Sequence, residues 1–270
     1  PFERNNMPAK KNTLKTDRFV AILAGGRGER FWPLSRQATP KQLLSLFDKK
    51  SFLQNTVERV KSVVPLKNIF IITNESQAAA IRKQLPKLPK DNVVAEPCGR
   101  NTCPAVALAA AMVGARSTTA TMAILPSDHV IPPKSEKKFQ RILEESLGLA
   151  GRGQAIVTIG IKPTGPETGY GYIQMGDKLP PPKERKAYKT AFHVAQRFVE
   201  KPEFDRALEY VNDGGYRWNA GMFVFSYATI DNALKDHNKE LHGAFYRWAN
   251  VGNDPKKLKV ALKKDYQTLR

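Results

Sequence analysis

The segment that decides the fold spans residues 19–30 and reads FVAILAGGRGER. It begins with five apolar residues and passes directly into a turn that contains Gly25, Gly26, Arg27 and Gly28. A short apolar run that ends at glycines is typical of a buried strand followed by a loop. Glycine lets backbone N–H groups approach phosphate oxygens closely, and arginine adds fixed positive charge. The segment therefore predicts a loop that holds phosphates at the exit of a strand.

Two better-known glycine loops do not fit this segment. The dinucleotide fingerprint needs a third glycine three places after Gly28, where the chain has Phe31. The P-loop ends in Gly-Lys-Ser/Thr, but the next lysine here is Lys41. Between the turn and that lysine lies a Pro-Leu-Ser-Arg run at residues 33–36, and a Pro-Lys-Gln run follows at residues 40–42. The loop therefore belongs to another class of phosphate-binding protein.

The rest of the chain alternates short β-branched runs with longer helical stretches. This pattern predicts an α/β fold with a Rossmann-like, mainly parallel mixed sheet flanked by helices. Strands are expected at residues 19–23, 69–73, 93–95, 121–125 and 155–160, and helices at residues 52–63, 75–84, 102–115 and 137–149. From residue 163 onward the sequence is rich in strand-forming residues, and a proline-rich polar stretch at 179–189 predicts a surface loop.

Three chemically informative positions follow predicted strands. Gly25 comes after the first strand, Glu96 after the third and Asp128 after the fourth. Ligands of such sheets bind at the carboxyl ends of the strands. We therefore expect these three segments, which are far apart in the sequence, to converge on one edge of the sheet.

The composition favours anionic partners and a cytosolic protein. Lysine and arginine number 44 against 25 acidic residues, which gives a net charge of +19. Because the basic residues are scattered and not interleaved with aromatic residues, nucleic acid is not an expected partner. No apolar run is long enough to cross a membrane and no secretory signal is evident, so a soluble, cytoplasmic protein is expected. The pair Cys98 and Cys103 lacks the partners of a zinc site and is interpreted as reduced thiols.

Six motifs in collinear order resemble one family. Residues 23–42 carry Gly-Gly-x-Gly-x-Arg, Pro-Leu-Ser and Pro-Lys, and resemble the signature of the sugar-phosphate nucleotidylyltransferases. The resemblance is strongest to its mannose-1-phosphate guanylyltransferase branch and rests on ERFWPLSR at 29–36, EPCGRNTCPA at 96–105, LPSDH at 125–129, TGYGYI at 168–173, FVEKP at 198–202 and WNAGMF at 218–223. It implies a fold of the nucleotide-diphospho-sugar transferase type.

The resemblance also implies a domain organisation. Residues 1–15 would be a flexible basic extension, and residues 16–270 would form one nucleotidylyltransferase domain. Within that domain, a nucleotide half is expected at about 16–160 and a sugar half at about 161–270. The sequence does not fix the oligomeric state, and a homodimer is one option.

The implied reaction is attack of mannose-1-phosphate on the α-phosphorus of GTP, which gives GDP-mannose and pyrophosphate with help from Mg²⁺. A phosphate nucleophile is already ionised, so the protein has only to align two anions and neutralise their repulsion. The implied catalytic residues are Arg27, Lys41, Asp128 and Lys201, with Asp128 as the metal ligand. The implied nucleotide-binding residues are Gly25, Gly26, Gly28, Glu96, Arg100, Asn101 and Ser127. The implied sugar-phosphate-binding residues are Gly171, Tyr172, Glu200, Lys201 and Asn219.

Each of these positions also has an ordinary structural explanation. Lys41 could be a surface cation, Asp128 could cap a turn, Asn101 could cap the helix that follows it, and Glu200 with Lys201 could be a solvated charged pair. Position in the motifs favours the functional interpretation. His129 is expected to make a positional hydrogen bond, because this chemistry needs no general base.

The sequence departs from the family at one point. A second metal-binding carboxylate is expected beyond the helix that follows Ser226, but Asp231 and Asp236 fall within that helix and no other match is evident. C-terminal truncation, under which nucleotide would bind but turnover would be poor, therefore stays open. So do two other functions: a related transferase that uses another nucleotide or hexose phosphate, and a catalytically silent regulatory subunit that binds a nucleotide-sugar.

Overall fold

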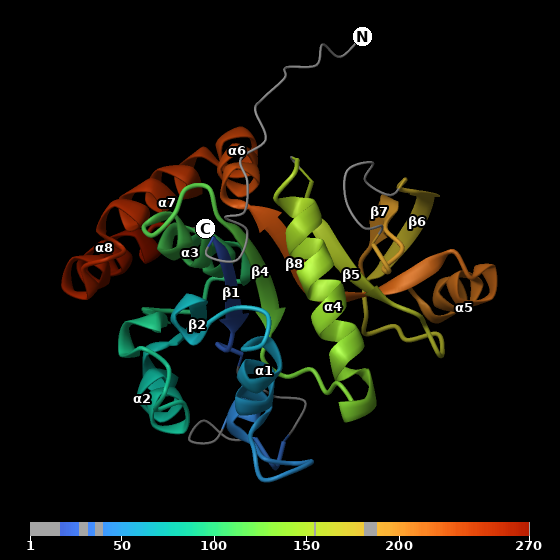
Figure 1. The fold of residues 1–270 in the computed structure, drawn as a ribbon, viewed down its shortest axis with the longest axis horizontal. Helices are drawn as coiled ribbons and strands as arrows, with labels where there is room; N and C mark the ends of the chain where they lie inside the picture. Colours follow the sequence, from blue (N-terminus) through green and yellow to red (C-terminus); the bar gives the residue numbers. More distant parts are fainter. Residues whose placement is uncertain (1–16, 27–31, 36–39, 154, 181–187, 270) are drawn as a thin grey trace.

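The computed structural model describes residues 17–26, 32–35, 40–153, 155–180 and 188–269. These residues form three layers, with helices on both faces of one mixed sheet (Figure 1). The basic extension at 1–15, together with Arg27 and Gly28 of the glycine-rich turn, lies outside the described residues.

Parallel strands form the first half of the sheet. They are β1 (Arg18–Leu23), β2 (Ile69–Asn74), β3 (Val93–Glu96) and β4 (Thr121–Pro126), in the order β3-β2-β1-β4. Along β1, Phe19 and Ala21 join the core on one face while Val20 and Ile22 join the core on the other. Both faces are buried, which is why β1 reads as a continuous apolar run.

Three helices cover one face of these strands. They are α1 (Phe52–Val60), α2 (Glu75–Gln84) and α4 (Pro133–Ala150). Side chains such as Leu53, Ile81 and Leu143 are fully buried against the sheet. The first two helices begin at polar caps: Ser51 and Gln54 form a capping box for α1, and the Asn74 side chain accepts from a backbone N–H of α2.

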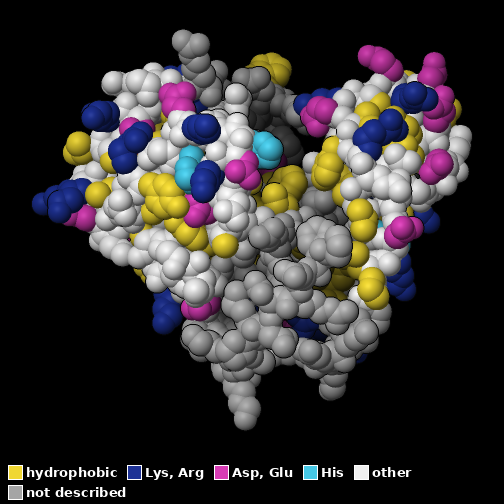
Figure 2. Space-filling model, turned by 90° about the horizontal axis from the view of Figure 1, so that it is seen from above, with side chains coloured by type: hydrophobic (Ala, Val, Ile, Leu, Met, Phe, Trp, Pro, Cys, Tyr) yellow, Lys and Arg dark blue, Asp and Glu magenta, His cyan; other side chains and the backbone are white. Residues whose placement is uncertain are grey.

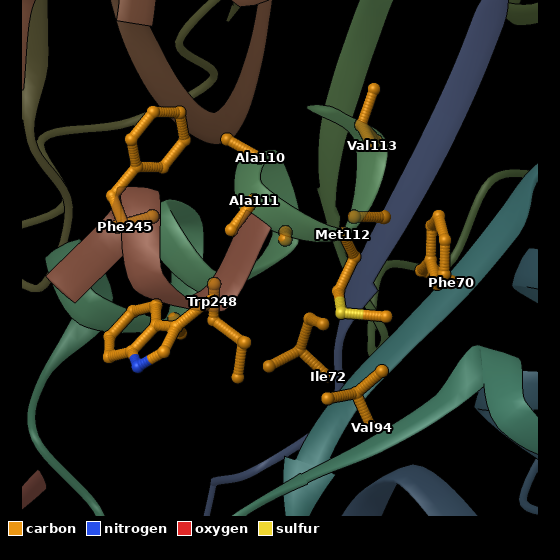
Figure 3. Close-up of a cluster of buried hydrophobic side chains, with 14 of the residues drawn as sticks. Phe70, Ile72, Val94, Ala110, Ala111, Met112, Val113, Phe245 and Trp248 are labelled. Carbon is orange, nitrogen blue, oxygen red and sulfur yellow. The ribbon is translucent and has the colours of Figure 1, made fainter. Parts of the chain in front are cut away.

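The opposite face carries α3 (Thr102–Gly114), α6 (Tyr227–His237), α7 (Lys239–Val251) and α8 (Pro255–Tyr266). α3 lies against the sheet, and its small side chains allow α7 to pack on it from outside. In Figure 3, Met112 of α3 lies beside Phe70 and Val94 of the strands, and Phe245 and Trp248 of α7 lie on the other side of α3. This face therefore ties the C-terminal helices to the first half of the chain.

The second half of the sheet is antiparallel. It consists of β5 (Val157–Ile161), β6 (Tyr172–Lys178), β7 (His193–Val199) and β8 (Tyr216–Ser226), with α5 (Phe204–Asp213) beside it. The long strand β8 joins the two halves, because its last residues pair with β4 and its first residues pair with β6. Figure 1 shows β8 crossing between the two parts of the molecule.

The predicted fold class is confirmed: the structure is an α/β fold with a mixed sheet flanked by helices. The predicted strands all form, although the last one is shifted to Val157–Ile161. Helix α4 begins at Pro133, four residues before the predicted start at 137. Its first turn is polar and starts with proline, which suits a helix N-terminus but carries no apolar periodicity to mark it.

None of the helices within the described residues is long and apolar enough to cross a membrane.

The buried face of α1 supplies a test of this packing. Leu53→Ala removes a fully buried side chain and should lower the free energy of unfolding by about 2–5 kcal/mol in urea titrations. Val260→Ala on α8, where valine is 70% exposed, is the control and should change it by no more than about 0.5 kcal/mol. Equal effects of the two substitutions would contradict the assigned packing of α1.

Candidate active site

The candidate site lies where the order of the parallel strands reverses, between β1 and β4. The chain order runs outward from β1 through β2 to β3 on one side and resumes with β4 on the other. In doubly wound sheets the crevice outside the carboxyl ends of such strands binds the ligand. The backbone N–H of Ser127, which follows β4, donates to the carbonyl of Leu23 at 3.2 Å. The exits of β1 and β4 are thus held together at the predicted edge.

An ion pair lies at this edge. Lys41 Nζ pairs with Asp128 Oδ2, and both side chains are about three-quarters buried, at 27% and 22% exposure. A Cβ added at Gly26 would lie 3.9 Å from Lys41 Cε, so the lysine stem passes beside the glycine-rich turn. The structure thus brings together Gly26, Lys41 and Asp128, which the sequence predicted to share a site.

Gln42 fixes the position of this lysine. The short 3₁₀ turn Lys41–Leu43 contains Gln42, which is fully buried and donates from Nε2 to the carbonyl of Ala24 at 2.8 Å. The same nitrogen also donates to Gln77 Oε1 on α2. Thr73 Oγ1 of β2 is a second donor to the Ala24 carbonyl, at 2.9 Å. Buried polar groups need such partners, so this network locks the lysine turn to the exit of β1.

Glu96, the last residue of β3, approaches the same edge from the other side. It is 7% exposed, and a Cβ added at Gly25 would lie 3.7 Å from its Oε2. Its Oε1 accepts a hydrogen bond of 2.9 Å from the hydroxyl of Tyr266 on α8. Burial raises the pKa of Glu96 from its ordinary value of 4.5 to about 7, and the tyrosine hydrogen bond opposes this shift. The structure therefore brings Gly25, Glu96 and Asp128 to one edge of the sheet, as the sequence predicts.

The Arg100 side chain donates hydrogen bonds to backbone carbonyls of the protein. Its Nε donates to the carbonyl of Tyr266 at 3.1 Å, and its Nη2 reaches the carbonyl of Gln267 at 3.4 Å. These carbonyls lie at the C-terminal end of α8, where the helix dipole favours a cation. In this arrangement Arg100 holds the loop after β3 against α8.

Asn101 and Lys201 both have a backbone φ that non-glycine residues rarely adopt. They are the two non-glycine residues with positive φ in the part of the chain that the structure describes, at 61° and 42°. Such strain is found preferentially at functional sites. Asn101 occupies the N-cap position of α3, yet its side chain makes no capping hydrogen bond within the described residues. The ordinary capping explanation therefore does not account for this asparagine.

The residues predicted to bind the sugar phosphate form a second group. A Cβ added at Gly171 would lie 3.0 Å from Glu200 Oε2 and 3.6 Å from Asn219 Cβ. Glu200 Oε1 pairs with Lys201 Nζ at 2.9 Å, and both side chains are exposed. Because Ile124 of β4 pairs with Phe223 in an antiparallel ladder, the residues of β8 before Phe223 run past the carboxyl end of β4. Asn219 therefore lies toward the edge that also carries Asp128.

Tyr172 differs from its neighbours in this group. Its side chain is fully buried, and its ring centroid lies 5.5 Å from that of Tyr210 on α5. Tyr172 thus packs in a small buried cluster with Ala207, Tyr210 and Tyr216 and does not face a sugar pocket, and its hydroxyl has no hydrogen-bond partner among the described residues.

Metal binding would need a group of acidic or histidine side chains close together. Within the described residues, no cluster of three or more His, Cys, Asp or Glu side chains could hold a metal ion. Asp231 pairs with His242 at 2.7 Å and accepts from Tyr246 at 2.9 Å, so it is engaged between α6 and α7. Burial lowers the pKa of His129, which favours its neutral form beside Asp128.

Two residues that organise the site carry no clear signal in the sequence. Gln42 falls within the Pro-Lys-Gln run, but only its burial beneath Ala24 reveals its positioning role. Tyr266 contacts Glu96 across 170 residues of chain, and no local pattern could reveal that contact.

A mixed sheet with a glycine-rich turn, a lysine and a carboxylate at its switch point is typical of proteins that handle phosphorylated nucleotides. The chain belongs to the Nucleotidyl transferase family, whose model matches residues 20–259.

Individual relatives agree with this assignment. Mannose-1-phosphate guanylyltransferase RfbM of Salmonella typhimurium is 40% identical over 83% of this chain and 45% of that protein. A mannose-1-phosphate guanylyltransferase of Klebsiella pneumoniae is 42% identical over 76% of this chain and 42% of that protein. A crystal structure from Thermus thermophilus, named mannose-1-phosphate geranyltransferase, has a TM-score of 0.76 at 33% identity and covers 94% of this chain and 68% of that one. The chain spans about half the length of the curated relatives it matches.

The raised pKa of Glu96 predicts a pH dependence of stability. Between about pH 4.5 and 7 the folded protein keeps a proton that the unfolded chain has lost, so the free energy of unfolding should fall as pH rises through this window. Glu96→Gln is neutral at every pH, so the difference in unfolding free energy between wild type and variant should change by about 3 kcal/mol across the window.

Urea titrations at a series of pH values measure this difference. Glu209→Gln, which removes an exposed carboxylate paired with Arg206, is the matched control and should run parallel to wild type. A Glu96→Gln curve that also runs parallel to wild type would show that Glu96 titrates normally in the folded protein.

Proposed function

We propose that this chain transfers GMP from GTP to mannose-1-phosphate, giving GDP-mannose and pyrophosphate. The proposal is supported by relatives of about 40% identity that are named mannose-1-phosphate guanylyltransferases. The observation that carries it is the Lys41–Asp128 pair beside Gly26, with the Glu96 carboxylate beside Gly25 at the same edge of the sheet. One side of the crevice suits phosphates and a cation, and the other offers acceptors for a base.

On the nucleotide side, the backbone of Gly25, Gly26 and Gly28 would approach the triphosphate. Arg27 and Lys41 would offset the negative charge that grows on the departing pyrophosphate. The nucleophile is an ionised phosphate oxygen, so neither residue has to move a proton. Their contribution is to align two anions in line and lower the repulsion between them.

The donor set at the end of β4 fits Mg²⁺. This ion prefers oxygen ligands and commonly uses one or two carboxylates while phosphate oxygens complete its octahedron. Asp128 would be the protein ligand, and the ion would supply charge neutralisation at the phosphates. Asp128 is 22% exposed and pairs with Lys41, so its carboxylate is held beside the lysine at the end of β4.

On the sugar side, Lys201 would bind the incoming phosphate as a point charge and Glu200 would accept from sugar hydroxyls. The absence of a side chain at Gly171 leaves room beside Glu200 Oε2, where a Cβ would come within 3.0 Å. Asn219 would contribute its amide to the same pocket. The left-handed backbone of Lys201 supports a functional interpretation, since this strain is otherwise unexplained.

Asp128→Asn tests the proposed catalytic centre. The substitution keeps the shape of the side chain but removes the charge that would hold Mg²⁺, so pyrophosphate release from GTP and mannose-1-phosphate should fall by about 100-fold or more. Asp231→Asn, which neutralises a partly buried aspartate paired with His242 between α6 and α7, is the control and should retain activity. Wild-type rates in Asp128→Asn would rule out this role for the carboxylate.

Lys201→Met tests the sugar-phosphate side. Loss of the charge should raise the KM for mannose-1-phosphate by about tenfold or more while the Kd for GTP stays unchanged. Lys178→Met removes an exposed lysine at the far end of β6 and should leave both constants unchanged. A parallel loss of GTP affinity in Lys201→Met would argue against separate nucleotide and sugar sides.

A further inference from the structure

Tyr266, in the last turn of α8, touches both ends of the loop that follows β3. Its hydroxyl donates to Glu96 Oε1 at 2.9 Å, and its carbonyl accepts from Arg100 Nε at 3.1 Å. The residue is fully buried and lies beyond the stretch that matches the family, which ends at residue 259. One tyrosine from a distant helix thus holds the segment on which Glu96 is presented to the crevice.

The tyrosine is itself rigidly held. Its ring stacks on that of Trp248 with centroids 5.5 Å apart. The neighbouring residue Asp265 is 5% exposed and accepts from Trp248 Nε1 at 2.8 Å and from Arg247 Nη2 at 2.8 Å. Figure 3 shows Trp248 packed in the buried cluster between α7 and α3. The position of the hydroxyl is therefore fixed before any ligand binds.

The two oxygens of Glu96 have different surroundings. Oε1 is engaged by Tyr266, whereas Oε2 faces the glycine-rich turn at Gly25. An ionised carboxylate only accepts hydrogen bonds, and each oxygen has two lone pairs. Guanine presents two adjacent donors, N1–H and the exocyclic N2 amine, whereas adenine has an acceptor at N1. A carboxylate with a fixed orientation in this crevice therefore favours guanine.

We propose that Tyr266 is a positioning residue for base selection: its hydroxyl orients the Glu96 carboxyl group and favours its ionised form, which accepts from the two donors on the edge of guanine. This inference rests on the proposed function, because it assumes that a guanine nucleotide occupies the crevice. It adds a specificity determinant from α8, a helix that contributes no other residue to the proposed site.

The groups that surround Glu96 come from three elements. α8 contributes Tyr266, the loop contributes Cys98 and Arg100, whose side chains contact the Tyr266 carbonyl, and β2 contributes the neutral Asn74, opposite Glu96 in the ladder. Burial raises the pKa of Glu96 to about 7 even with the hydrogen bond from Tyr266. Loss of that bond leaves the buried carboxyl with a still higher pKa, so less of it is ionised at neutral pH.

The test is a comparison of GTP with ITP, which differs only in lacking the N2 amine. Calorimetry gives the Kd of each nucleotide from pH 6 to 9, and the ITP/GTP ratio cancels the titration of the triphosphate. In wild type this ratio should rise through about pH 7 and then level off. In Tyr266→Phe, which keeps the ring, the rise should move up by about one pH unit, and GTP binding at pH 7 should weaken about fivefold and recover at high pH.

Three further variants sharpen the comparison. Glu96→Gln should give a ratio that is flat with pH. Tyr246→Phe removes the hydroxyl of another tyrosine–carboxylate pair, with Asp231, and should match wild type. Site-specific replacement of Tyr266 by 3-fluorotyrosine preserves the packing and makes the hydroxyl a stronger donor, so the rise should move to lower pH. This last variant carries the test if Tyr266→Phe does not fold.

A Tyr266→Phe profile that superimposes on wild type, or an unshifted profile with 3-fluorotyrosine, would overturn the proposal. So would a pH-dependent ratio that survives in Glu96→Gln, or a wild-type protein that binds no GTP or does not distinguish it from ITP. Turnover is a separate readout. If the protein binds GTP as described but releases no pyrophosphate, the proposed function fails while the role of Tyr266 is still decided by binding.

Discussion

The pairing of β1 between β2 and β4 is the constraint on which the rest of the structure depends. Parallel strands deliver their carboxyl ends to one edge, so this pairing brings the glycine-rich turn, Glu96 and Asp128 together from distant parts of the sequence. Helices must then cover both faces of the sheet, since both faces are apolar. The location of the crevice follows from the order of the strands before any side chain chemistry is considered.

Buried hydrogen bonds position the Lys41 turn at the edge that the strand order creates. The Ala24 carbonyl at the exit of β1 accepts from both Gln42 and Thr73, and this shared acceptor aligns the lysine turn with the sheet. Lys41 then meets Asp128, and its charge is held near the turn at low exposure. Gln42 and Thr73 are fully buried, so the loss of either donor would be costly. Contacts within the protein therefore fix the positions of Lys41 and Asp128. On the face seen in Figure 2, lysine and arginine side chains are scattered over the surface of the described residues.

The crevice also draws on elements outside the parallel strands. β8 extends past β4 and carries Asn219 toward the same edge, while α8 reaches back to Glu96 through Tyr266. The backbone is strained at Asn101, which follows β3 in the parallel half, and at Lys201, which follows β7 in the antiparallel half. Both residues belong to motifs identified in the sequence. Strain at both places is consistent with a site assembled from both halves of the sheet.

The sequence by itself determined the strands of the parallel half, the glycine-rich turn at Gly25 and Gly26, and the convergence of Glu96 and Asp128, because these depend on local apolar runs and on the geometry of parallel sheets. Only the tertiary structure decided that Lys41 pairs with Asp128, that Gln42 locks its turn, that Tyr172 is buried and that Tyr266 holds Glu96. These contacts join residues far apart in the chain, and their energies depend on burial, which no local pattern of residues encodes.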